Sequence, residues 1–214
     1  MTSPSSSRDR VLGRVRRALA EAPEAPEVTR DYLVSHTPDD PVTVLDLLHE
    51  NLVDYRAGVH RGTRQGLPSL IGRLLADHGA RFVVVPPGLP GAWLADSDAR
   101  RRYDDDPPLT PAELDSADAV VTGCALAVAE TGTVVLDAGP GQGRRALTLI
   151  PDLHICVVDV PGQVVASLPQ AMPRLDPTRP TTWISGPSAT SDIELDRVEG
   201  VHGPRTLEVV LVVD

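Results

Sequence analysis

The chain has 214 residues, of which 41% are hydrophobic and 23% are charged, so it can bury one substantial core as an ordinary globular protein. Its formal net charge of -10 argues against a general affinity for nucleic acid or anionic membranes, because both require a basic surface. No apolar run has the length of a membrane span or of a signal-peptide core, and we therefore expect a cytoplasmic protein.

Two features of the composition exclude whole classes of chemistry. Cys124 and Cys156 are the only cysteines, too few to ligate an ordinary iron-sulfur cluster or a structural zinc, so we expect no metal and no cofactor in this chain. All 20 basic residues are arginines. The lack of lysine excludes a Schiff-base mechanism and the lysine of a phosphate-binding loop.

The N-terminal region is predicted to form a basic amphipathic arm. Ser7 is a suitable N-cap for a helix over 8–21, in which apolar residues recur at helical spacing and five arginines oppose one aspartate. Residues 22–41 are rich in proline and acidic residues, as is typical of a linker. We expect the arm and linker to occupy 1–41, docked on the chain's own domain or on a partner protein, and an α/β domain to occupy 42–214.

Helical and strand patterns alternate from residue 42 onward, which indicates an α/β fold with a mixed, partly parallel central sheet flanked by helices. The elements expected in the first half are helices over 42–51 and 67–78, strands over 52–59 and 81–85, and a solvated loop over 96–111. Those expected in the second half are strands over 118–122, 126–130, 133–137, 146–150, 155–160, 181–184 and 206–213, a hairpin turn over 139–143 and a helix over 163–172.

Glu130 is a single carboxylate within the apolar stretch 120–136. A buried ionised group needs hydrogen bonds, a cationic partner or a ligand, and the hydroxyls of Thr131 and Thr133 lie beside it in the sequence. Gly132 allows a turn or the close approach of a ligand. Glu130 therefore either ends a sheet or serves as a functional acid, a nucleophile or base, on the floor of a pocket.

Two later stretches are candidates for binding an anion. Ser185, Gly186, Ser188 and Thr190 follow a predicted strand, where hydroxyls and free backbone N–H groups can cradle an anion or simply cap a helix. His202 and Arg205 lie between glycine and proline before the last strand, and arginine offers a planar fork for a carboxylate or phosphate.

His154 and Cys156 are two residues apart on one predicted strand and so face the same side. One such pair is too few ligands for a metal, and a histidine hydrogen-bonded within the fold is the favoured interpretation.

Five segments of the last 100 residues or so together resemble one family, the LUD-domain proteins, and within it the lactate-utilisation protein C group. They are Thr122-Gly-Cys, Ala129-Glu-Thr-Gly-Thr133, Leu149-Ile-Pro-Asp-Leu-His-Ile-Cys-Val-Val158, Ser185-Gly-Pro-Ser-Ala-Thr-Ser-Asp-Ile-Glu194 and Gly200-Val-His-Gly-Pro-Arg205. The resemblance implies a fold of the NagB/RpiA/CoA-transferase type and a role in oxidising L-lactate to pyruvate alongside partner proteins that carry iron-sulfur clusters. It also implies recurrent residues at Glu130, Thr131, Gly132, Thr133, His154, Ser188, Thr190, Asp192, His202 and Arg205.

Three functions remain open from the sequence. The chain is a cluster-free accessory subunit of a lactate-oxidising system, with a pocket for a small organic anion or a partner's segment. Alternatively, it is a free-standing enzyme that uses Glu130 on an acyl or sugar-phosphate substrate, or a non-catalytic assembly or regulatory protein. We expect Glu130, His202, Arg205 and the 185–190 loop to converge on one cleft at the ends of the central strands, where open α/β sheets place their ligands.

Overall fold

The computed structural model describes residues 6–20, 27–190, 198–200 and 202–213. It divides into two compact units, residues 1–32 and 33–214. None of the helices formed by the described residues combines the length and the apolar character needed to cross a bilayer.

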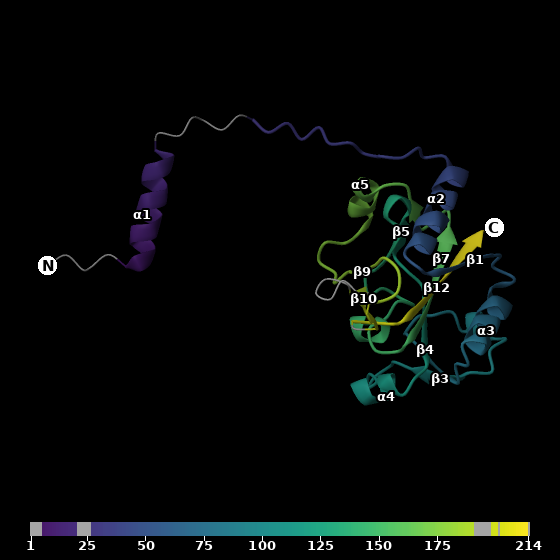
Figure 1. Cartoon of the computed structure of the whole chain (residues 1–214). Coiled ribbons are helices and arrows are strands. Elements are labelled where there is room, and N and C mark those ends of the chain that lie inside the picture. Colours follow the sequence, from purple (N-terminus) through teal and green to yellow (C-terminus); the bar gives the residue numbers. More distant parts are fainter. Residues whose placement is uncertain (1–5, 21–26, 191–197, 201, 214) are drawn as a thin grey trace. The chain divides into compact units, whose positions relative to one another are not determined.

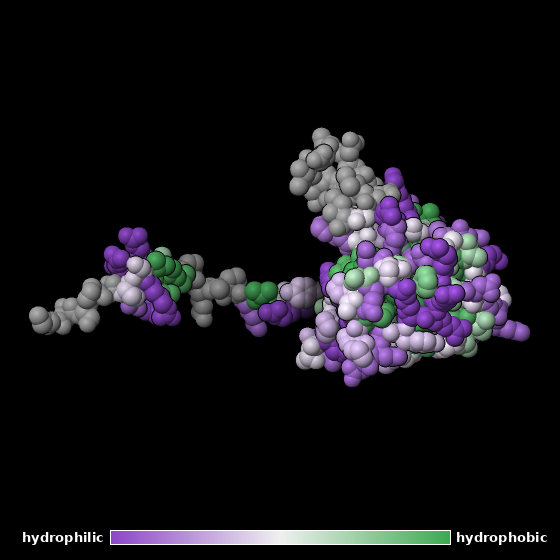
Figure 2. All heavy atoms as spheres, turned by 90° about the horizontal axis from the view of Figure 1, so that it is seen from below, coloured by the Kyte–Doolittle hydropathy of each residue, from purple (hydrophilic) through white to green (hydrophobic). Residues whose placement is uncertain are grey.

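The first unit contains α1 (Ser7–Leu19), which begins one residue earlier than predicted. Its N-cap is Ser6, whose hydroxyl accepts from the Asp9 N–H, while the Asp9 carboxylate accepts from the Ser6 N–H. Hydrophobic side chains gather along one side of this helix and hydrophilic ones cover the rest (Figure 2). Val11, Val15 and Leu19 form the apolar side, and each is about half exposed or more.

The second unit is built on a six-stranded sheet in the order β1-β12-β7-β4-β2-β3 (Figure 1). Every neighbouring pair in it is parallel. The central strands β7 (Leu153–Val160) and β12 (Thr206–Val213) pair along their whole length. The remaining strands are β1 (Gly58–Gly62), β2 (Phe82–Val85), β3 (Arg100–Tyr103) and β4 (Ala119–Thr122).

Helices cover both faces of this sheet, as parallel strands require (Figure 1). α3 (Leu67–Asp77) packs its leucines against one set of alternate side chains, including Ile155 of β7 and Val210 of β12. α2 (Pro41–Asp54) packs against the opposite set, including Val158 of β7. The short helix α4 (Pro111–Asp115) and the 3-10 turn η1 (Gly91–Leu94) lie on the connections that lead to β4 and β3.

A second, smaller sheet shares the α2 side of the main sheet. Its order is β8-β5-β6-β9, formed by β8 (Val164–Val165), β5 (Leu126–Val128), β6 (Thr133–Leu136) and β9 (Thr182–Ile184). The β5–β6 and β6–β9 pairs are antiparallel, whereas β5–β8 is parallel. A separate two-stranded ribbon joins β10 (Ala189–Thr190) to β11 (Val198–Glu199). The mixture of strand directions expected from the sequence therefore belongs to the second sheet.

Five sequence predictions of secondary structure were wrong. Leu52 continues the buried stripe of Val44 and Leu48, so α2 extends to Asp54 where a strand was expected. Residues 145–148 form the 3-10 turn η3 (Arg145–Thr148) instead of a strand. Residues 163–172 form β8 and the short α5 (Leu168–Ala171), because the Gln163 side chain bonds the backbone of Asp159 and Cys124 and holds a turn there.

The fourth was the solvated loop over 96–111, which contains the edge strand β3. Two of its arginines stack on Phe82 of β2, with Arg102 4.4 Å and Arg100 6.0 Å from the ring centre. Charged residues on an edge strand discourage pairing with another chain. The predicted hairpin turn over 139–143 was also wrong, because this segment connects β6 to the 3-10 turn η3 and not to a second strand. It packs on the loop after β2, where Gly141 N–H donates to the Pro87 carbonyl.

One carboxylate, Glu208 of β12, lies on the α3 side of the sheet and is only 8% exposed. Its two oxygens bind different histidines: Oε2 lies 2.7 Å from His60 Nε2 on β1, and Oε1 lies 2.8 Å from His78 Nε2 at the end of α3. A side chain at position 58 would collide with this carboxylate, which explains Gly58. Glu208 therefore ties the edge strand and the helix to the centre of the sheet.

We predict that Glu208→Gln lowers the free energy of unfolding by about 1–3 kcal/mol, because a hydrogen-bonded buried charge is lost. The control is Asp46→Asn, whose carboxylate contacts Arg61 of the same edge strand but is 53% exposed and should change stability by less than about 1 kcal/mol. Urea denaturation of both variants measures the difference. Equal effects would show that Glu208 is solvated in solution.

Candidate functional site

A cavity of about 270 Å³ opens on the α2 side of the main sheet, beside the first residues of β7 and β12. His154 and Leu207 of these strands line it, η3 supplies one wall, and β9 with the loop after it supplies another. The remaining chain around the cavity is the turn before β12. The lining residues are Arg145, Thr148, Leu149, His154, Thr182, Trp183, Ile184, Ser185, Gly186, Pro187, Ser188, His202, Gly203, Pro204 and Leu207.

The cavity lies at the amino ends of the central parallel strands, whereas open α/β sheets place their ligands at the carboxyl ends. The reason is the second sheet. β9 runs antiparallel to β6, and the segment that leaves it, residues 185–188, is brought over the start of β7 and β12. The carboxyl-end rule describes open sheets whose connecting loops alone form the site, and here a second sheet supplies the wall.

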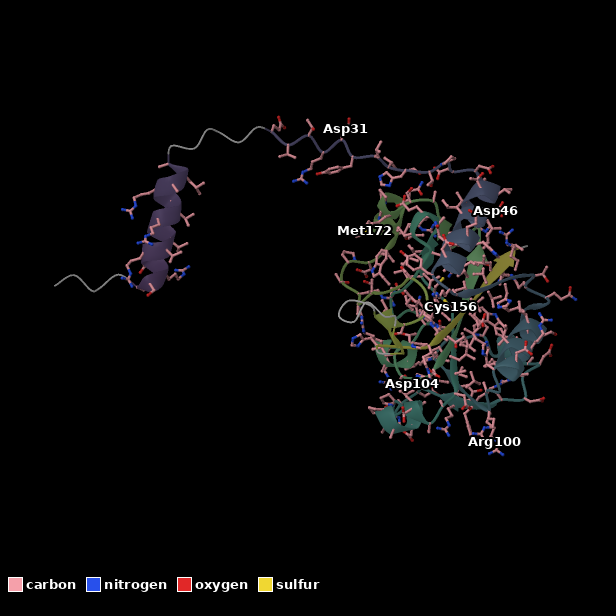
Figure 3. The ribbon with its side chains drawn as sticks, viewed as in Figure 1. Asp31, Asp46, Arg100, Asp104, Cys156 and Met172 are labelled. Carbon is pink, nitrogen blue, oxygen red and sulfur yellow. The ribbon has the colours of Figure 1, made fainter. Side chains whose placement is uncertain are left out.

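His154 lies in the floor of the cavity and is 1% exposed. Its Nε2 is 2.8 Å from Thr122 Oγ1, on the neighbouring strand β4, and Thr122 is itself fully buried. Burial lowers the pKa of His154 to about 4, because the charged imidazolium would lose its hydration. His154 is thus a neutral hydrogen-bonding group at neutral pH. Cys156, on the same face of β7, is fully buried in the packed interior (Figure 3).

The loop after β9 is held in place by backbone contacts. Gly186 has a φ of +80° and lies so close to Tyr55 that a Cβ would be 2.3 Å from the Tyr55 carbonyl oxygen. Ser188 N–H donates to the Pro204 carbonyl, and Ser188 Oγ accepts from the His202 N–H at 3.0 Å. Parts of the two predicted anion-binding stretches, residues 185–188 and 202–204, are therefore joined and face one cavity.

Thr133 and Thr131 form a chain of hydroxyls that ends at the cavity. Ser185 Oγ lies 2.8 Å from Thr133 Oγ1, which lies 2.8 Å from Thr131 Oγ1. Between them Gly132 has a φ of +54° and packs against the Asn51 backbone, where a Cβ would be 2.7 Å from the carbonyl carbon. Thr133 supports the cavity from behind, whereas Thr131 and Gly132 do not line it.

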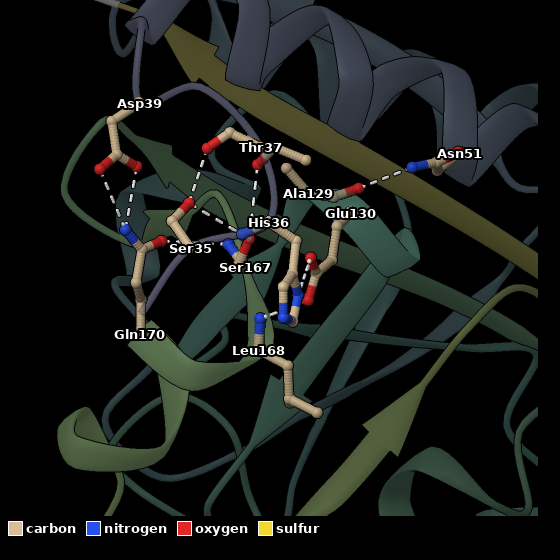
Figure 4. A network of polar contacts seen from close by, with 10 residues as sticks. All are labelled: Ser35, His36, Thr37, Asp39, Asn51, Ala129, Glu130, Ser167, Leu168 and Gln170. Carbon is tan, nitrogen blue, oxygen red and sulfur yellow. Dashed lines mark hydrogen bonds and ion pairs between the residues drawn. The ribbon is translucent and has the colours of Figure 1, made fainter. Parts of the chain in front are cut away.

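Glu130 does not face the cavity, contrary to the expected convergence. It lies in the 3-10 turn η2 (Ala129–Thr131), where Oε1 accepts from the Leu168 N–H at 2.6 Å and Oε2 lies 3.1 Å from His36 Nδ1 (Figure 4). Burial alone would raise the pKa of Glu130, but hydrogen bonds from Leu168, Ser167 and His36 outweigh it and lower the pKa. The apolar sequence around Glu130 reflects β5 and β6, while its carboxylate points to the segment before α2.

That segment, residues 35–39, is not an unattached linker. His36 N–H donates to Ser167 Oγ at 2.8 Å, and Gln170 Nε2 donates to the Asp39 carboxylate at 2.9 Å (Figure 4). Because Ser167 is fully buried, its hydroxyl needs these partners. Glu130, with His36, thus fastens residues 35–39 to the turn before α5.

Arg205 also lies outside the cavity, although its neighbours Gly203 and Pro204 line it. Its Nε and Nη2 donate to the carboxylate of Asp152 and contact both oxygens, with Nε–Oδ1 at 2.8 Å. The hydrogen bond from Arg205 lowers the pKa of Asp152 below its usual range. The Arg205–Asp152 pair joins the turns that precede β7 and β12.

Arg145 is the charged cavity residue that sequence analysis missed, together with the hydroxyls of Thr148 and Thr182. It is exposed, and it has no ion-pair partner within the described part of the chain. The sequence signal for a cation at this site was the adjacent pair Arg144-Arg145. Arg144 binds Asp104, with Nε–Oδ2 at 3.0 Å, and only Arg145 lines the cavity. The backbone of Thr190 lies in β10, and Asp192 is outside the described residues.

The donor set does not fit an iron-sulfur cluster. Cys124 and Cys156 are both buried, and a hydrogen bond between them, together with burial, raises the pKa of the Cys124 thiol. Cluster ligands are thiolates, usually four. The described residues also contain no group of three or more histidine, cysteine or acidic side chains arranged to hold a metal ion.

The burial of neutral His154 makes stability depend on pH. The unfolded chain protonates this residue near pH 6.5, whereas the folded chain keeps it neutral to about pH 4. The unfolded state therefore binds more protons between these values, and the contribution of His154 to stability falls as the pH falls. Between pH 7 and pH 5 the loss is about 2 kcal/mol.

We predict that His154→Gln, which keeps a polar group near Thr122, removes this part of the pH dependence. The difference in unfolding free energy between the variant and the wild type should shift by about 2 kcal/mol in favour of the variant between pH 7 and pH 5. Urea denaturation at both pH values measures it. A difference independent of pH would mean that His154 is solvated in the folded chain.

Comparisons with known proteins identify the family to which this arrangement belongs. Residues 108–212 match the LUD domain. The whole chain is similar to "Lactate utilization protein C" of Deinococcus radiodurans, at 44% identity over 99% of both chains. It is also similar to the protein of the same name from Exiguobacterium sp., at 29% identity over 98% of this chain and 97% of that one.

A solved structure has the same fold. The crystal structure of a DUF162-family protein from Deinococcus radiodurans superposes with a TM-score of 0.68, at 41% identity, and covers 82% of this chain and 100% of its own. The chain belongs to the LUD-domain family, within the lactate utilization protein C group.

Proposed function

We propose that this chain acts in lactate utilisation as a cluster-free accessory subunit of an iron-sulfur-dependent system that oxidises L-lactate to pyruvate. In this role the cavity between η3, β9 and the start of β7 binds a small organic anion. The names of the relatives support a role in lactate utilisation. The cavity supports the more specific proposal that this chain binds the organic acid.

The observation that carries the proposal is the composition of the cavity wall. Arg145 supplies a cation that has no ion-pair partner among the described residues, His154 and His202 supply imidazoles, and Thr148, Thr182, Ser185 and Ser188 supply hydroxyls. No carboxylate is present among the described residues that line it, although acidic residues outnumber basic ones by 30 to 20 in the chain. Such a wall favours a negatively charged ligand.

The volume favours a small anion. At about 270 Å³ the cavity is smaller than the range of roughly 300–1,000 Å³ that is usual for drug-sized ligands. A three-carbon acid therefore suits it better than a nucleotide or a coenzyme. Leu149, Ile184 and Leu207 provide apolar surface for the methyl group of such an acid.

The iron-sulfur clusters would be carried by partner proteins. Two buried cysteines leave this chain without the ligands for a cluster, so electron transfer from lactate requires another subunit. The contribution of this chain is to bind and orient the organic acid through Arg145 and the hydroxyls of the cavity.

The position of Glu130 makes the free-standing enzyme a weaker alternative. Hydrogen bonds from Leu168, Ser167 and His36 lower its pKa, which weakens it as a base, and it lies away from the cavity. As a nucleophile it would first have to lose these partners. No observation favours this second function over the accessory role.

We predict that Arg145→Gln weakens binding of L-lactate and pyruvate by roughly 10- to 100-fold, since a charge-assisted hydrogen bond contributes about 1.5–3 kcal/mol. The matched control is Arg205→Gln, which removes an arginine paired with Asp152 outside the cavity and should leave affinity within about twofold. Isothermal titration of the full chain measures both. Unchanged affinity in Arg145→Gln, or a larger loss in Arg205→Gln, would contradict the proposed site.

A further inference from the structure

We propose that His154 and Thr122 recognise the oxygen atom on C2 of a 2-hydroxy or 2-oxo monocarboxylate, while its carboxylate group faces Arg145. This inference rests on the proposed function and deepens it, because it specifies the chemical class of acid that the cavity selects. His154 contacts the ligand, and Thr122 acts through His154 as a positioning residue.

The first step is the hydrogen-bonding state of the His154 ring. Nε2 is occupied by Thr122 Oγ1 at 2.8 Å, and Nδ1 has no partner among the described residues. Among the described residues, His49 Nδ1 is the one side-chain nitrogen or oxygen that is both inaccessible to solvent and without a hydrogen-bond partner, so His154 Nδ1 is not an inaccessible atom. His154 Nδ1 is therefore open to the cavity that the residue lines, on a side chain that is otherwise 99% buried.

The second step is that this ring must be neutral and so carries one donor and one acceptor. The Thr122 hydroxyl can donate or accept, and His154 is its partner in the described chain. When Thr122 donates to Nε2, Nδ1 carries the proton and donates to a ketone oxygen. When Nε2 donates to Thr122, Nδ1 accepts from a hydroxyl. The pair can thus bind both the hydroxy acid and the oxo acid without acquiring charge.

The third step is what happens with an acid that lacks the C2 oxygen. Propionate has the same carbon skeleton and carboxylate as lactate but leaves Nδ1 facing a methylene group. An open polar atom covered by an apolar group loses its hydration without gaining a hydrogen bond. A site built on such a bond rejects the analogue that lacks the partner atom.

The experiment compares L-lactate, pyruvate and propionate by isothermal titration on the full chain. We expect lactate and pyruvate to bind about tenfold more tightly than propionate. Thr122→Val, which removes the hydroxyl, should bring this ratio close to one. Thr122→Ser, which keeps the hydroxyl, should keep most of the ratio. Arg145→Gln should instead weaken all three acids together and leave the ratio unchanged.

The outcomes separate this inference from the proposed function. If the wild type binds lactate and propionate equally and Arg145→Gln weakens both, the proposed role of His154 and Thr122 is wrong, but the cavity remains the site that binds organic anions. If the wild type binds none of the three acids, the anion site itself is wrong and the inference with it. Should Thr122→Val fail to fold, the wild-type ratio and the Thr122→Ser ratio still decide the matter.

Discussion

The central strands β7 and β12 are buried on both faces, and this constraint shapes the rest of the structure. Their side chains alternate between the two faces, so one set must pack against α3 and the other against α2 and the second sheet. Two buried polar residues interrupt the apolar pattern, His154 and Glu208, and they lie on opposite faces. Each is tolerated because it is hydrogen-bonded: Glu208 to His60 and His78, and His154 to Thr122.

The two polar residues differ in what their surroundings leave available. Both oxygens of Glu208 are occupied by histidines, so it connects elements and has no free position for a ligand. His154 uses one ring nitrogen and keeps the other open at a cavity. The same requirement for pairing of buried groups therefore produces a structural connection on the α3 face and a candidate binding site on the other.

The second sheet determines which sequence motifs meet. β6 and β9 bring Thr133 behind Ser185, and the loop after β9 joins the His202 turn through Ser188. Glu130 is carried by the same sheet to its far end, where with His36 and Ser167 it attaches residues 35–39. Glu130, which resembles a catalytic acid in the sequence, thus has a structural role and holds the segment before α2 in place.

The helix α3 and the central strands β7 and β12 were predictable because their sequence patterns are strong. The leucines of α3 recur at helical spacing, and β7 and β12 are runs of β-branched residues. The division into two sheets was not, since β5 and β6 are as apolar as β7 and periodicity does not specify the partner of a strand. Likewise, adjacent Arg144 and Arg145 look equivalent until the fold pairs Arg144 with Asp104.

The six histidines offer a direct test of the claim that the cavity beside His154 is the ligand site, because they are spread over the molecule. His154 and His202 line the cavity, His36 lies beside Glu130, and His60 and His78 bind Glu208. The ring ¹⁵N resonances of the full chain can be followed by NMR while pyruvate is added. The account predicts that the resonances of His154 and His202 shift while those of His36, His60 and His78 stay in place. A shift of the His36 resonances with those of His154 unmoved would contradict it and return the site to Glu130.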